Sequence, residues 1–167
     1  MPTLQLANED ARIVALAIVY HLGRPGSETD PATYQHHELG LGPVGRELAS
    51  RLAAAQLSLD LTPYQLHRLD EALLGITNEL KQYELSRPRS AVPGFEAAIA
   101  SHFPELAHGE QQDEELATAL DLVTRVVMLR RRLGSAVAAA NAAIEGERAA
   151  VAEAARSPRP WWRVWGR

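Results

Sequence analysis

The feature that most constrains the fold is a long apolar stripe in the last third of the chain. Its residues recur three or four positions apart, which is the spacing of one face of an α-helix. They are Leu122, Val126, Leu129, Leu133, Val137, Ala140 and Ile144. Because the stripe keeps its phase across Gly134, we predict one helix from Gln112 to Ala155, about 65 Å long at about 1.5 Å per residue. The alternative is a break at Gly134, with Ser135 capping a second helix.

A second helical stripe follows the clearest helix-start signal in the chain. Thr62 stands at an N-cap position, Pro63 is the first helical residue, and Gln65 completes a capping box. The apolar positions that follow alternate three and four residues apart: Leu66, Leu69, Leu73, Ile76, Leu80 and Tyr83. A heptad pattern of this kind indicates coiled-coil-like packing along another helix. We therefore expect residues 63–85 to pair antiparallel with residues 113–133.

The remaining segments indicate shorter helices, one of which (residues 11–22) is apolar on nearly all sides. Leu57, Leu59 and Leu61 alternate with polar residues, but no partner strand is visible. We therefore interpret that segment as an extended connection. The predicted fold class is all-α: four to five helices form a helical bundle body, with a long C-terminal helix and an aromatic-basic tail.

The chain divides into three parts. Residues 1–133 form the helical body, which includes the first half of the long helix; residues 134–155 form an Ala-rich helical extension; residues 156–167 form the tail. Alanine at many positions of the extension permits close approach by another helix. A long exposed apolar stripe is also uncommon in a monomer. We therefore expect a homo-oligomer, and specifically a two-fold dimer.

Composition excludes several classes of protein. The chain has no cysteine, which excludes a thiol nucleophile, Cys-ligated zinc and iron–sulfur clusters. The longest apolar run, from Ile13 to Tyr20, is about half of what spans a bilayer. The N-terminus lacks the basic start of a signal peptide. We expect a cytoplasmic protein with no transmembrane helix.

The tail concentrates the aromatic and basic residues of the chain. Its twelve residues carry four arginines and no acidic residue, although the formal net charge of the whole chain is −4. All three tryptophans lie here, at Trp161, Trp162 and Trp165, with Arg159 and Arg163 among them. Tryptophan and arginine are typical of protein contact sites. We take these five residues as candidate partner-binding residues. The alternatives are packing of the tail on the body, adsorption to an anionic membrane surface, and stacking on single-stranded nucleic acid.

The sequence contains no catalytic motif that we recognise: there is no nucleophile elbow, P-loop, dinucleotide-binding loop or zincin motif. The residues that come closest to a metal site are Glu105 and His108, spaced as in di-iron bundles, and His67. Such bundles need a second Glu-x-x-His copy and further glutamates, which are missing. We therefore expect no metal site, no cofactor and no catalytic residues.

Together these observations predict a non-enzymatic helical interaction or adaptor protein. It would self-associate through its long helices and dock a protein partner through the tail, with two tails per dimer raising the effective concentration. One alternative is a ligand- or metal-binding helical bundle, with or without enzymatic activity. A second alternative is a small nucleic-acid-associated regulator.

Overall fold

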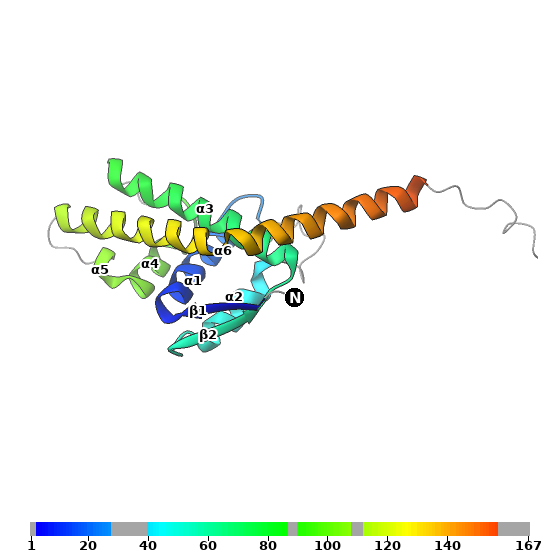
Figure 1. Cartoon of the computed structure of the whole chain (residues 1–167). Helices are drawn as coiled ribbons and strands as arrows, with labels where there is room; N and C mark the ends of the chain where they lie inside the picture. Colours follow the sequence, from blue (N-terminus) through cyan, green and yellow to red (C-terminus); the bar gives the residue numbers. More distant parts are fainter. Residues whose placement is uncertain (1–2, 28–39, 87–89, 108–111, 157–167) are drawn as a thin grey trace, which may run out of the picture.

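Helix α1 (Asn8–Gly23) packs against three other helices in the body of the protein, and the longest helix lies along one of those three and extends beyond the body (Figure 1). The computed structural model describes residues 3–27, 40–86, 90–107 and 112–156. Within these ranges five helices have eight residues or more: α1 (Asn8–Gly23), α2 (Leu41–Arg51), α3 (Pro63–Ser86), α4 (Phe95–His102) and α6 (Gln112–Arg156). A single turn, α5 (Pro104–Ala107), follows α4. Because α1 packs against α2, α3 and α4, its apolar residues are covered from several sides.

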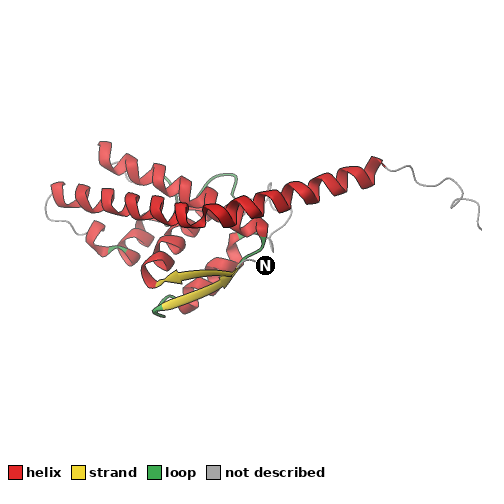
Figure 2. Ribbon diagram, in the orientation of Figure 1, coloured by secondary structure: helices red, strands yellow, loops and turns green. Residues whose placement is uncertain are grey.

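The prediction of an all-α fold is wrong in one respect, because two short strands pair beside α1 (Figure 2). Strand β1 (Thr3–Ala7) is antiparallel to β2 (Gln56–Asp60), with Leu6 opposite Leu57. The segment interpreted as an extended connection is therefore a strand. Its partner is the N-terminal segment of the chain, which has the same alternation of leucine with polar residues. The buried leucines of both strands face the helical core, and the polar side chains alternate to the exposed face.

The capping box predicted at the start of α3 is confirmed. The backbone N–H of Gln65 donates to Thr62 Oγ1 at 3.1 Å, and the backbone N–H of Thr62 donates to Gln65 Oε1 at 2.9 Å. Each side chain thus satisfies a backbone donor that has no partner within the helix. This reciprocal bond sets the first residue of α3 and hence the phase of its apolar stripe.

Helices α3 and α6 pack antiparallel, as expected, but the contact extends beyond residue 133: His67 Nδ1, near the start of α3, lies 2.8 Å from Asn141 Oδ1. In both helices, the residues of the apolar stripe are buried wherever their side chains are described. Polar contacts beside these stripes fix the register. Arg130 donates two hydrogen bonds to Asp70, at 2.7 and 2.8 Å, and the Tyr64 hydroxyl donates to Glu147 at 3.2 Å. Because the guanidinium is planar, the Arg130–Asp70 pair requires a defined relative orientation of the two groups as well as opposite charge.

Helix α6 is continuous through Gly134, which confirms the prediction of one unbroken helix. Its buried stripe extends as far as Ile144. Every residue from 145 to 156 is exposed; Glu147 still reaches Tyr64 of α3, and Figure 1 shows the end of α6 beyond it projecting past the other elements. The segment spans about three helical turns. None of the helices in the described part of the chain has the sustained apolarity that crossing a bilayer requires.

Candidate functional site

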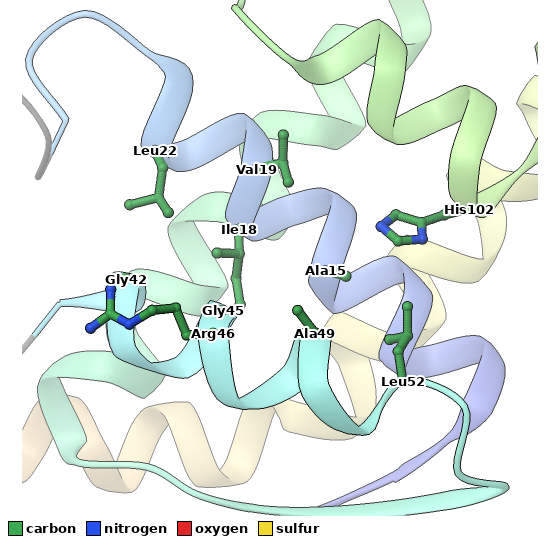
Figure 3. A pocket seen from close by; sticks show the side chains of 10 residues that line it. All are labelled: Ala15, Ile18, Val19, Leu22, Gly42, Gly45, Arg46, Ala49, Leu52 and His102. Carbon is green, nitrogen blue, oxygen red and sulfur yellow. The ribbon is translucent and has the colours of Figure 1, made fainter.

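A pocket opens between α1 and α2, and we call it the α1–α2 pocket. Its volume is about 460 Å³ (Figure 3). Helix α1 contributes Ala15, Ile18, Val19 and Leu22 to the wall. These residues belong to the side of α1 that faces α2. Three of them are only partly buried, so apolar surface of the central helix is left open to the pocket.

The opposite wall is hollow because α2 presents its smallest residues there. Gly42, Gly45 and Ala49 follow one another three and four positions apart and therefore share one face of α2. A Cβ atom on Gly45 would lie 2.9 Å from Ile18 Cγ2, so the two helices are in close contact at this point. Beside that contact, the small size of these α2 residues leaves the space between the helices unfilled, and this space is the cavity. The small residues at this spacing are visible in the sequence, but their position opposite α1 is not.

Two nitrogen-bearing side chains lie at opposite ends of the α1–α2 pocket. Figure 3 shows the Arg46 guanidinium beside Gly42 and the His102 imidazole at the other end, beyond Ala15. Arg12 lies near this end, since its Nη1 donates to the backbone oxygen of His102 at 3.4 Å. Among the described residues, no acidic side chain lines the pocket. The site is thus an apolar trough with positive charge near both ends.

The pKa of His102 is lowered from its ordinary value of 6.5, first by burial and second by the nearby positive charge of Arg12. The imidazole is therefore neutral at neutral pH. A neutral imidazole both donates and accepts a hydrogen bond. This end of the pocket can contact a polar group without requiring a second charge on it.

The lowered pKa predicts how His102 contributes to stability. Its folded-state pKa is below the unfolded-state value of 6.5, so the contribution of neutral His102 is fully present above pH 6.5. It is lost as the pH falls through the folded-state pKa. An NMR titration of the His102 ring is expected to give a midpoint below 6.5, and His102→Gln is expected to lose less stability on acidification than the native chain. A midpoint at or above 6.5 would contradict this account.

The partner-binding residues predicted in the tail, Trp161, Trp162, Trp165, Arg159 and Arg163, lie outside the described residues. The metal candidates are not brought together in the part that is described. His108 falls outside it, and Glu105 belongs to α5 with only its backbone described. His67 is on α3, where its Nδ1 lies 2.8 Å from Asn141 Oδ1. Among the described residues, no three metal-ligating side chains gather at one point.

The projecting end of α6 carries one face on which two charged residues flank two alanines. Glu145, Ala149, Ala152 and Arg156 follow at spacings of four, three and four. At about 100° per residue, the four positions fall within about 60° of one another around the helix. All four are exposed. We call them the α6 end face: a carboxylate and a guanidinium at its two ends, and two small residues between them.

Comparison of the chain with protein-family models, with curated proteins and with solved structures finds no match. The α1–α2 pocket and the α6 end face are therefore the features of the described residues from which a function is inferred.

Proposed function

We propose that the protein is a non-enzymatic interaction protein that pairs with a second copy of itself through the α6 end face. Each copy presents its Trp/Arg tail to a protein partner. The observation that carries the proposal is the exposure of every residue from 145 to 156 on a helix that extends beyond the other elements. No residue of this segment is buried by another element of the described part of the chain. Packing against the same segment of a second copy would cover these exposed side chains.

The α6 end face is complementary to itself when two copies run antiparallel. With the two-fold axis between residues 150 and 151, Glu145 meets Arg156 of the partner subunit, and Ala149 meets Ala152 of the partner subunit. The charged contact occurs twice because the interface is isologous. In a parallel pair, by contrast, Glu145 would face its own copy, and like charges in contact are unfavourable. The arrangement of charges therefore favours the antiparallel dimer.

Small residues allow the two helices to approach closely. Ala149 and Ala152 lie in the middle of the α6 end face, and alanine keeps helix propensity while leaving the backbone accessible. Close approach extends the dispersion contacts along the pair. The contact is nonetheless short, about three turns from each subunit, so we expect a dissociation constant of about 10 μM to 1 mM.

The tail follows α6 directly, so pairing would bring two copies of it into one particle. Trp161, Trp162 and Trp165 supply large, rigid contact area at a low cost in conformational entropy. Arg159 and Arg163 add charged hydrogen-bond donors around them. A partner that engages both tails would bind more tightly than one that engages a single tail, because the second contact forms at a high effective concentration.

Reversal of one charge on the α6 end face tests the pairing. In Glu145→Arg, the introduced arginine meets Arg156 of the partner subunit at two symmetry-related places. Exposed ion pairs contribute about 0.2–1 kcal/mol each, so we expect the dissociation constant to rise about tenfold. Sedimentation equilibrium over a concentration series up to about 1 mM measures it.

Ala154→Arg is the matched control. Residue 154 lies on the opposite side of α6 and is exposed, so the added arginine should leave association unchanged. A chain that stays monomeric over the whole concentration range would refute the pairing. An equal response to the two substitutions would show that association uses another surface.

A further inference from the structure

The geometry of the α1–α2 pocket points to a binding site for a small amphipathic carboxylate, with an aliphatic body of about ten carbons and one anionic head group. This inference is independent of the proposed pairing, because the pocket is formed by α1, α2 and α4 and not by α6. It gives the helical body a binding site of its own, separate from the α6 end face and the tail.

The size of the α1–α2 pocket fits a ligand of this class. A volume of about 460 Å³ lies within the range of about 300–1,000 Å³ that is usual for small-molecule sites. It corresponds to roughly fifteen water-sized groups at about 30 Å³ each. Water is a poor occupant for most of this space, since ordered water needs two to four polar partners and the middle of the pocket offers apolar side chains.

The walls determine the chemistry of the body of the ligand. Ile18, Val19 and Leu22 from α1 line one side, and Leu52 lies near the end of α2. These are aliphatic surfaces, and Val19, Leu22 and Leu52 are only partly buried in the protein alone. Covering them with an aliphatic chain removes apolar surface from water, which is the main driving force for such binding.

Arg46 determines the charge of the head group. The neighbouring arginine of α2, Arg51, donates to Glu47 at 2.8 Å and is thereby neutralised within its own helix. No acidic side chain in the described part of the chain pairs with Arg46, and the guanidinium stands at the end of the pocket beside Gly42 (Figure 3). A guanidinium matches the two oxygens of a carboxylate in geometry and charge. A cationic head group would meet Arg46 at one end and the positive charge of Arg12, near His102, at the other.

The test measures binding of three probes that share one chain and differ in head group: sodium decanoate, decanol and decyltrimethylammonium. The two ionic probes are added to the full chain below their critical micelle concentrations and decanol below its solubility limit. Binding is followed through amide shifts in ¹H–¹⁵N NMR spectra. We expect decanoate to shift the amides of α1 and α2 and to bind at least tenfold more tightly than decanol. Decyltrimethylammonium should be the weakest of the three.

Two substitutions examine the head group and the body of the ligand separately. Arg46→Gln is expected to weaken decanoate about tenfold or more and to leave decanol unchanged, whereas the matched variant Arg51→Gln should affect neither. Ala49→Phe should fill the pocket and prevent binding of both probes. Ala97→Phe, on an exposed position of α4 that does not line the pocket, is its control.

Several outcomes would overturn the inference. Equal binding of decanoate and decanol would show that the pocket binds apolar chains with no preference for an anionic head group. Shifts that map to another part of the protein, or that survive in Ala49→Phe, would show that the α1–α2 pocket is not the site. An absence of shifts at about 1 mM decanoate would show that the pocket does not bind an aliphatic carboxylate of this size.

Discussion

Replacement of Phe95 with alanine is expected to lower the free energy of unfolding by about 3–5 kcal/mol. The Phe95 side chain is 0% exposed and stands at the first residue of α4. Its ring meets the edge of the Tyr20 ring, with the centroids 5.5 Å apart and the planes at 68°. Truncation would remove this contact and leave a cavity between α4 and α1, because the helices around it can close only partly.

Urea unfolding followed by circular dichroism measures the change, and Met128→Ala is the control. Met128 is an exposed residue of α6, so its truncation should change the free energy of unfolding by less than about 0.5 kcal/mol. A loss below about 1 kcal/mol in Phe95→Ala would mean that α4 is not anchored on α1 as described.

Substitution at Gly75 is expected to have the second large effect. A Cβ atom on Gly75 would lie 2.4 Å from Cε1 of the Tyr20 ring, which is itself buried against Phe95. A larger residue therefore requires the buried Tyr20 ring to shift or the crossing of α1 and α3 to open. Gly75→Leu should therefore destabilise the protein by about 2–3 kcal/mol, although leucine favours helix more than glycine does.

Gly134→Ala separates helix propensity from packing. A Cβ atom on Gly134 would meet nothing within 4 Å, so the substitution should raise the free energy of unfolding by about 1 kcal/mol. Thermal unfolding of both variants would show a lower midpoint for Gly75→Leu and a higher midpoint for Gly134→Ala. Stabilisation by both substitutions would contradict the close contact between α1 and α3.

The two long helices were predictable because their signals are local and repeated. The capping box at Thr62 and the stripe behind it define the start and the buried face of α3. The stripe from Leu122 to Ile144 predicts one continuous α6, since a break would have shifted its phase at Gly134. Pairing of the two then follows, because each presents one long apolar face.

The strand pair was missed because neither strand carries a sufficient signal alone. Five residues separated from their partner by about fifty positions give no hairpin turn to recognise, and Leu57 and Leu59 appeared unpartnered. The missing evidence was the matching alternation at Leu4 and Leu6. Comparing alternating segments at large sequence separation would have found it.

The α1–α2 pocket could not be predicted, because a cavity depends on how two helices face each other. The small residues of α2 are visible in the sequence, but nothing local shows that they oppose Ile18. His102 reaches the pocket from α4, about fifty residues farther along the chain than Arg46. Only the packing of α4 on α1 brings the two side chains to one trough.

The most direct test of the proposed pairing is the mass in solution of four chains measured side by side: the native chain, Glu145→Arg, Arg156→Glu, and the variant that carries both substitutions. The proposal predicts that each single reversal weakens the dimer about tenfold and that the double reversal restores it, because opposite charges face each other again across the two-fold axis. Weakening that adds up in the double variant, or a monomer in the native chain at every concentration, would contradict antiparallel pairing through the α6 end face.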